Sequence, residues 1–163
     1  PAAVAERLEE AGGRYDEILV AYADCGTGGQ LDRILEPYGV RRLPGAHCYA
    51  FFAGLDRFDA LHEEEIGSFY LTDFLVRNFD RLVVRGLGLD RHPELRSSYF
   101  GNYRRVVYLA QTRSEPLLAR ARECAEQLEL DFEHRFTGLN PLADALGIAP
   151  PSAPGEGDKA WNA

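Results

Sequence analysis

The chain has 163 residues, of which 45% are hydrophobic and 27% are charged, and its 18 Lys and Arg against 26 Asp and Glu give a net charge of -8. These values are ordinary for one globular domain, and they exclude general disorder, a collagen-like repeat and a disulfide-stapled miniprotein. No apolar run reaches the roughly 18 residues of a membrane span, and the acidic balance is the reverse of the basic surface that nucleic-acid binders present. We therefore expect neither a membrane nor a nucleic-acid partner.

The three cysteines follow no regular framework, which fits a reducing compartment better than secretion. We therefore expect a cytoplasmic protein, and no secretory signal is visible. Because no Met begins the chain and Pro1 leads directly into a predicted helix, we expect a processed or truncated start. Residues 1–149 are predicted to form a single α/β domain. Residues 150–163, rich in Pro, Ser, Gly and charge, are predicted to form a flexible C-terminal tail.

The expected elements alternate between helices and strands along the chain. In the first part we expect a helix over residues 4–11, a strand over 15–23, a helix from residue 31, a strand over 40–43 and helices over 46–53 and 55–65. Residues 18–21 form a nearly continuous apolar run, which is typical of a strand covered on both faces.

The second part continues the same alternation. We expect an extended segment over 69–71, a helix capped by Thr72 or Asp73 with a stripe of Leu75, Phe79, Leu82 and Val83, a short helix from Pro93, a strand over 105–110, a helix with Leu117, Ala121, Cys124, Ala125 and Leu128 on one face, a strand over 131–136 and a helix over 142–146. This order predicts an α/β fold, namely a three-layer Rossmann-like domain with a mainly parallel sheet.

The loop after the first predicted strand carries Cys25, Gly26, Thr27, Gly28 and Gly29. In open α/β sheets, ligands bind at the carboxyl ends of strands, where the next helix presents free N–H groups. Gly26 to Gly29 are therefore candidate cofactor-binding residues, and Cys25 near the helix N-terminus is a candidate nucleophile. The loop matches neither a Walker loop nor a dinucleotide fingerprint. In the alternative interpretation the glycines only turn the chain and Cys25 is a buried, inert residue.

A second candidate pair, His47 and Cys48, follows the next short strand. Because successive parallel strands end on the same edge of a sheet, Cys25 and Cys48 are expected to approach each other there. With His47, and with His92 from a later loop, they would form a soft metal site, for which zinc is the default and iron, cobalt or copper are the alternatives. The alternative is that Cys48 packs inward while His47 makes local hydrogen bonds.

Three other features have mainly structural interpretations. His62 and Glu65 have the spacing of paired metal ligands, but the acidic residues around them are typical of a solvated helix face. Cys124 lies in the apolar stripe of its predicted helix, and His134 lies in a strand. Both are expected to be structural.

Three segments carry a resemblance to a known family. They are Tyr22-Ala23-Asp24-Cys25-Gly26, Leu43-Pro44 with His47-Cys48 and Gly54, and Gly67-Ser68-Phe69-Tyr70-Leu71-Thr72. Together they resemble the uncharacterised bacterial and archaeal family called domain of unknown function 1638, over most of residues 15–146. The resemblance implies an α/β fold, and because members often stand beside corrinoid-dependent methyltransferases, it implies an accessory role in methyl transfer. Archaeal members tend to have Asp where this chain has His47.

Three functional hypotheses follow. The first is a metal- or metallocofactor-binding protein that uses Cys25, Cys48 and His47 or His92, with a small molecule or metallocofactor and corrinoid methyltransferase proteins as partners. The second is a thiol enzyme in which Cys25 is the nucleophile and His47 or His92 is the base. The third is a module that binds a small anion on the Gly26–Gly29 loop. We favour the first, because two cysteines follow successive strands.

Overall fold

The strands of the structure form a three-stranded and a two-stranded sheet, and all their pairings are parallel. A computed structural model describes residues 2–43, 45 and 47–148. β3 (Ser68–Thr72), β4 (Arg105–Ala110) and β5 (Asp131–Phe136) pair in the order β3-β4-β5, and β1 (Leu19–Val20) pairs with β2 (Arg41–Arg42). The register places Val107 of β4 between Tyr70 and Glu133. The predicted parallel pairing is therefore confirmed.

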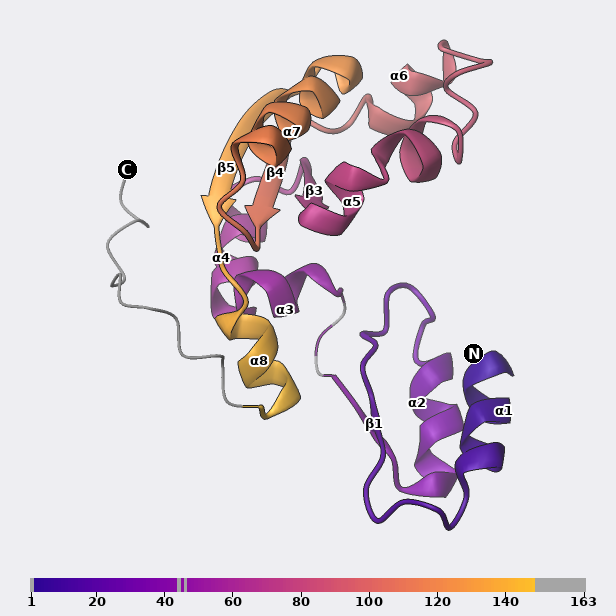
Figure 1. Cartoon of the computed structure of the whole chain (residues 1–163). Helices are drawn as coiled ribbons and strands as arrows, with labels where there is room; N and C mark the ends of the chain where they lie inside the picture. Colours follow the sequence, from indigo (N-terminus) through magenta and orange to yellow (C-terminus); the bar gives the residue numbers. More distant parts are fainter. Residues whose placement is uncertain (1, 44, 46, 149–163) are drawn as a thin grey trace.

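Helices precede, connect and follow these strands (Figure 1). Their bounds are α1 (Ala2–Ala11), α2 (Gln30–Leu35), the 3-10 helix η1 (Glu36–Tyr38), α3 (Tyr49–Ala53), α4 (Leu55–Glu64), α5 (Asp73–Arg77), the π-helix η2 (Asp80–Val84), α6 (Leu95–Phe100), α7 (Glu115–Leu128) and α8 (Asn140–Leu146).

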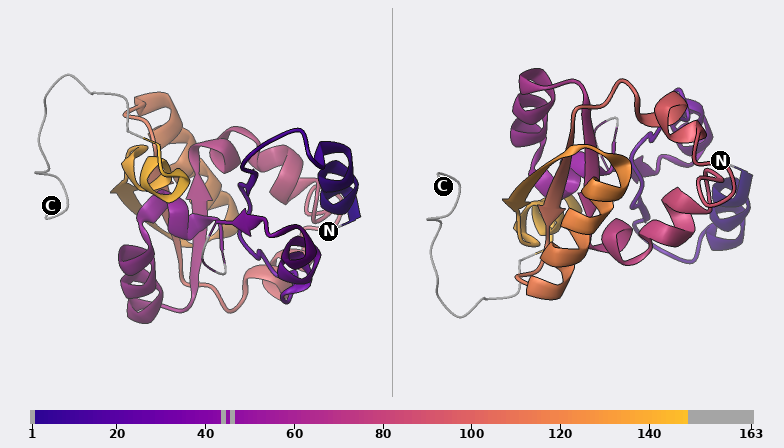
Figure 2. Two further views of the ribbon diagram at one scale, coloured as in Figure 1. Left: turned by 90° about the horizontal axis from the view of Figure 1, so that it is seen from below. Right: turned by 90° about the horizontal axis from the view of Figure 1, so that it is seen from above.

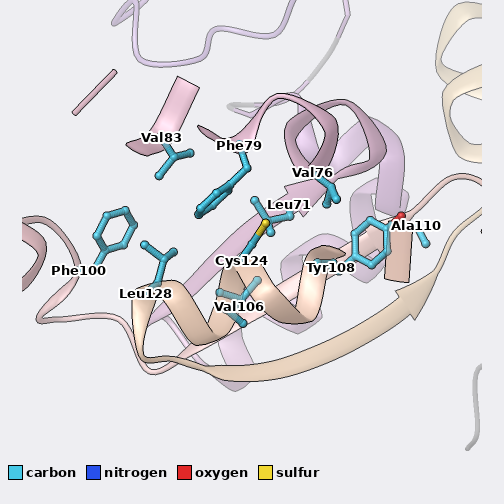
Figure 3. Close-up of a cluster of buried hydrophobic side chains, with 12 residues drawn as sticks. Leu71, Val76, Phe79, Val83, Phe100, Val106, Tyr108, Ala110, Cys124 and Leu128 are labelled. Atoms are coloured by element: carbon cyan, nitrogen blue, oxygen red, sulfur yellow. The ribbon is translucent and has the colours of Figure 1, made fainter. Parts of the chain in front are cut away.

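Two layers of helices cover opposite faces of the three-stranded sheet. On one face, Val106 and Tyr108 of β4 pack in a cluster with residues of α5, η2, α6 and α7 (Figure 3). On the other face, Val107 and Leu109 pack with residues of α3 and α4. In Figure 2, α7 and α4 accordingly lie on opposite sides of the strands. The chain thus has a three-layer, Rossmann-like α/β fold, as its sequence predicts.

Helix α7 shows how local sequence produces one of these layers. Its N-cap is Ser114, whose hydroxyl accepts a hydrogen bond from the N–H of Leu117 at 3.4 Å. Its buried residues are Ala121, Cys124, Ala125 and Leu128, which recur at helical spacing and face the sheet. The predicted stripe is confirmed, including the structural role of Cys124.

The elements α1, β1, α2 and β2 lie together at one end of the molecule, and α3 lies between them and the three-stranded sheet (Figure 1). Leu8, Leu31 and Leu35 form the small core of this end. A separate cluster centred on Ala23 and Leu43 packs against Phe51 of α3. The loops after β1 and β2 are thereby placed against the helix that covers the larger sheet.

The first predicted strand is much shorter than expected. The prediction of a strand over residues 15–23 covered on both faces is wrong, because the ladder contains only Leu19 and Val20 and one side chain, Leu19, is 40% exposed. Tyr15 and Tyr22 are also exposed, at 67% and 63%. An apolar run indicates a tendency to be buried, but it does not say how many neighbours will cover it. In the described chain, β1 pairs with β2 alone.

The helix after β3 is interrupted, where the apolar stripe predicted one helix. Thr72 caps α5 as expected and accepts from the N–H of Leu75. At Asn78, however, the side-chain amide donates to the carbonyl oxygen of Phe74 at 2.9 Å, and the backbone leaves the helical region before η2 begins. This is the usual competition of Asn with the backbone for hydrogen bonds.

Two predictions fall partly or wholly outside the described residues. The tail predicted over 150–163 lies entirely outside them. The helix predicted over 46–53 is observed as α3, but its first predicted residue, Ala46, lies outside the described residues. Within the ranges that the structure describes, no helix has the length and apolar composition of a membrane span.

Candidate functional site

The loop between β1 and α2 is closed by the carboxylate of Asp24. The hydroxyl of Thr27 donates to Oδ1, and the N–H groups of Gly28 and Gly29 donate to Oδ2 and Oδ1 at 3.1 and 3.0 Å. These hydrogen bonds, that of Thr27 foremost, hold the pKa of Asp24 below its ordinary value. The donors that an external anion would use here are already occupied, so the geometry does not favour the anion-binding hypothesis.

The same loop has a left-handed backbone at several positions. Gly26, Gly28 and Gly29 have φ values of 83°, 60° and 76°, which glycine adopts without steric cost. Cys25 also has a positive φ, of 45°, although it carries a Cβ. For a residue with a side chain, this conformation costs about 1 kcal/mol, and it persists only where neighbouring contacts fix the chain. The hydrogen bonds from Thr27, Gly28 and Gly29 to the carboxylate of Asp24 close the loop around Cys25 and supply such contacts.

The structure brings the thiols of Cys25 and Cys48 together. Cys25 is exposed, Cys48 is half-buried, and the Cys25 side chain lies near enough to act on the Cys48 thiol through its charge and by hydrogen bonding. Burial first, and then the nearby Cys25, raise the pKa of Cys48 to about 11. At neutral pH, Cys48 therefore keeps its proton while Cys25 faces solvent.

Arg42 of β2 connects the segments that carry the two thiols. Its guanidinium donates to both carboxylate oxygens of Asp32 in α2 at 2.6 and 2.9 Å, and to the carbonyl oxygens of Leu43 and Gly45 at 2.8 and 3.1 Å. The carbonyl of Gly45 also accepts the N–H of Asp24 at 3.5 Å. The guanidinium also interacts electrostatically with Cys25, although its larger interactions are with Asp32.

Tyr49, the first residue of α3, is the other polar side chain at the thiol pair. Burial first, and then the nearness of Cys48 and Cys25, raise its pKa to about 12. Its ring lies 5.6 Å from that of Tyr70 and 6.5 Å from that of Phe58, between centroids. Tyr49 thus remains a neutral hydroxyl group that is held in place by aromatic packing.

The predicted histidines are not gathered at the thiols. His47 is exposed and its ring lies 6.3 Å from that of Phe58 in α4. His92 pairs with Glu94 at 3.2 Å, in the segment between η2 and α6, which Figure 1 places far from the loops after β1 and β2. In the described part of the chain, no three His, Cys, Asp or Glu side chains stand close enough to hold a metal ion. The complete site expected from the sequence is therefore not assembled; only its two sulfurs are.

The second histidine and carboxylate pair is also structural. The ring of His62 stacks on Phe58 at 6.2 Å, and the carboxylate of Glu65 accepts the N–H of Gly67 at 2.8 Å. Neither side chain faces a shared ligand position, which agrees with the interpretation of this segment as a helix surface.

A cavity of about 700 Å³ is lined by residues of α3, of the start of α4 and of α8. Its wall includes Phe51 and Gly54, the buried Thr137 directly after β5, and the carboxylates of Asp56 and Asp144. Such a volume is ordinary for a small-molecule site. Phe51 also belongs to the cluster against which Cys48 packs, so the cavity and the thiol pair border the same cluster.

Asp24, Arg42 and Tyr49 are site residues that the sequence does not reveal as such. Asp24 stands three residues before Thr27-Gly28-Gly29, in a glycine-rich loop typical of a turn closed by an aspartate side chain, and this is the one local signal available. The positions of Arg42 and Tyr49 depend on the packing of β2 and α3, and no local pattern indicates them.

Fold and site together define a Rossmann-like α/β protein with a pair of free thiols at the carboxyl ends of two neighbouring strands. The chain belongs to the family described as Protein of unknown function (DUF1638), whose model matches residues 1–146. The family resemblance inferred from the motifs is confirmed. No curated protein and no solved structure matches the chain.

Proposed function

We propose that the chain is a metal- or metallocofactor-binding protein in which the sulfurs of Cys25 and Cys48 are the soft ligands. The observation that carries the proposal is the contact between these two thiols. Two thiolates attract zinc, which needs no redox partner and accepts mixed sulfur and nitrogen ligands. Iron and corrinoid cobalt are the alternative metals. Cys48 must lose its proton on binding, and a cation beside it supplies the driving force.

Two sulfurs leave coordination positions open, which suits a site that exchanges a ligand rather than a closed structural zinc site. His47 is adjacent to Cys48 in the chain and exposed, and it is the proposed third ligand, although its ring must turn from Phe58 toward the sulfurs for this. His92 is not included, because it pairs with Glu94 in a distant segment. A site with open positions also fits an accessory role in corrinoid-dependent methyl transfer in the cytoplasm, with corrinoid methyltransferase proteins as partners.

Zinc titration of protein purified without a histidine tag tests the proposal. We expect one equivalent of bound zinc, and cobalt substitution should give a thiolate charge-transfer band. Cys25→Ala and Cys48→Ala should each weaken binding at least tenfold and remove the band, whereas the matched control Cys124→Ala, at a buried thiol in α7, should change neither. A wild type that takes up no metal, or binding that survives both site substitutions, would refute the proposal.

A second candidate function is favoured by the exposure of Cys25. Cys25 is exposed, interacts electrostatically with the guanidinium of Arg42 and has the protonated thiol of Cys48 as a neighbour, and these are features that favour a nucleophilic cysteine. The rate of alkylation of Cys25 against pH tests it. A titration midpoint at or above the ordinary thiol value of about 8.5 would count against nucleophilic catalysis.

A further inference from the structure

We propose that Cys25 and Cys48 form a reversible disulfide, so that the thiol pair is a redox-controlled site. The inference rests on the same thiol contact as the proposed function, but it requires no metal. A disulfide would consume both sulfurs, and the oxidised form would therefore be unable to bind a thiophilic cation.

Backbone hydrogen bonds hold together the two segments that lead to the cysteines. The β1–β2 pairing is extended by the hydrogen bond from the N–H of Leu43 to the carbonyl of Val20 at 3.2 Å. The N–H of Asp24 then reaches the carbonyl of Gly45, which Arg42 also binds. The bond between Asp24 and Gly45 joins the chain one residue before Cys25 to the chain three residues before Cys48, which places the two cysteines on neighbouring segments, as a disulfide requires.

The two sulfurs have unequal access to solvent, which sets the order of events. Cys25 is exposed, whereas Cys48 is half-buried and packs with the cluster of Ala23, Leu43 and Phe51. A dissolved oxidant therefore meets Cys25 first. Arg42, a cation, interacts electrostatically with Cys25, and the neutral Tyr49 interacts with both thiols.

With a low-molecular-weight disulfide such as oxidised glutathione, the step balances. The Cys25 thiolate attacks one sulfur of the oxidant, breaks its S–S bond and releases one glutathione thiolate. Cys48 then loses its proton to solvent, and its sulfur attacks Sγ of Cys25 and expels the second glutathione. The two protein thiols are oxidised, one glutathione disulfide is reduced, and the two thiol protons finish on the two glutathione molecules.

The third cysteine provides an internal control. Cys124 is fully buried in α7, within the cluster shown in Figure 3, and burial raises its pKa to about 11. Buried thiols of this kind react slowly. The proposal therefore predicts oxidation of two of the three cysteines, with Cys124 remaining a thiol in the folded chain.

The test uses the full chain, freed of metal with a chelator and equilibrated in glutathione redox buffers. After quenching with iodoacetamide in denaturant, which exposes Cys124, intact mass should show the loss of two hydrogens and one remaining alkylation site, and peptide mapping should link Cys25 to Cys48. Cys124→Ser should form the same link. Cys48→Ser should instead stop at a glutathione adduct on Cys25, and dithiothreitol should reverse both products.

Two further readouts separate this inference from the proposed function. The disulfide between Cys25 and Cys48 should raise Tm by roughly 7 to 14 °C, because it restrains the unfolded chain. The oxidised protein should not bind zinc until the disulfide is reduced. A link that forms in protein unable to bind zinc refutes the metal proposal alone. Stable glutathione adducts without a link, or a link that involves Cys124, overturn the disulfide proposal whatever the zinc result.

Discussion

Asp73 offers a direct test of how the carboxyl edge of the main sheet is stabilised. It is the first residue of α5, follows β3 directly, and is 4% exposed. Its carboxylate accepts hydrogen bonds from the hydroxyl of Tyr108 at 2.8 Å, from the N–H of Gln111 at 3.0 Å, and from the N–H and hydroxyl of Thr112 at 3.1 and 2.6 Å. One side chain therefore joins α5 to the end of β4 and the turn after it.

The substitution Asp73→Ala removes the acceptor and leaves the donors in place. Tyr108 is 1% and Gln111 8% exposed, so their donors would be left without a partner and away from water. Each such loss costs about 1.5 to 2 kcal/mol when the acceptor was charged. The donors of Thr112 are only partly buried and regain water at little cost. We therefore expect a loss of about 3 to 4 kcal/mol, a large fraction of a typical domain's stability.

Tyr108→Phe is the matched control. Burial first, and then the hydrogen bond to Asp73, raise the pKa of Tyr108, so this hydroxyl remains a donor across the accessible pH range. Its removal leaves the carboxylate with its other donors, and the expected cost is about 1 kcal/mol.

Urea unfolding at neutral pH, followed by far-ultraviolet circular dichroism, measures both variants. The argument predicts an unchanged m-value and a midpoint shift for Asp73→Ala about three times that for Tyr108→Phe. If Asp73→Ala costs less than about 1 kcal/mol, or no more than Tyr108→Phe, the carboxylate does not organise this edge of the sheet.

Further predictions concern individual side chains. Burial, and then the nearby Arg122, lower the pKa of His134 from 6.5, so its protonation favours the unfolded chain and stability should fall as pH drops from about 7.5 to about 5. His134→Gln should flatten that decline in the urea midpoint, and an unchanged slope contradicts the assignment. Cys25→Gly should be about 1 kcal/mol more stable than Cys25→Ala, because φ is 45° at this position, and equal Tm values would exclude backbone strain. Arg105→Met should lower the free energy of unfolding in urea by about 2 to 3 kcal/mol, because the largely buried carboxylate of Glu133 loses a guanidinium contact at 2.7 Å. The double variant with Glu133→Leu should recover part of this free energy, and no recovery would contradict a role of the ion pair in stability.

The larger sheet could be predicted from the sequence because its signals are local. β4 and β5 have the bounds expected from residues 105–110 and 131–136, and α7 has the expected apolar stripe. In each case the pattern itself describes the burial, since β4 is covered on both faces and α7 on one. Periodicity identifies such elements before any neighbour is known.

The N-terminal sheet could not be predicted as well, because its extent depends on neighbours. Residues 18–21 have the composition of a doubly covered strand, yet Leu19 is 40% exposed and only β2 pairs with β1 in the described residues. At Asn78, one side-chain hydrogen bond to the backbone coincides with the interruption of an otherwise continuous helical pattern. Both outcomes are decided by contacts that a hydrophobic pattern does not encode.

The candidate site shows the same division. The approach of Cys25 and Cys48 follows from topology alone, because parallel neighbouring strands end together. The position of His47 depends instead on Phe58, a residue of the following helix, and that of Asp24 on the closure of its own loop. The sequence therefore predicted which sulfurs meet, but not which groups surround them.

The thiol contact depends on two separately packed parts of the chain. Cys25 belongs to the loop of the N-terminal sheet, whose core is Leu8, Leu31 and Leu35, whereas Cys48 immediately precedes α3, which packs on the main sheet. The two parts meet in the cluster that contains Phe51, and this side chain also lines the 700 Å³ cavity. A ligand in the cavity, a metal on the sulfurs and a disulfide between them would therefore all act on the same junction. The metal and the disulfide exclude each other, because both use the same two sulfurs. A ligand in the cavity can be coupled to either of them: any free energy that it gains by fixing the junction is available to the sulfur state that is present, because coupling between sites is reciprocal.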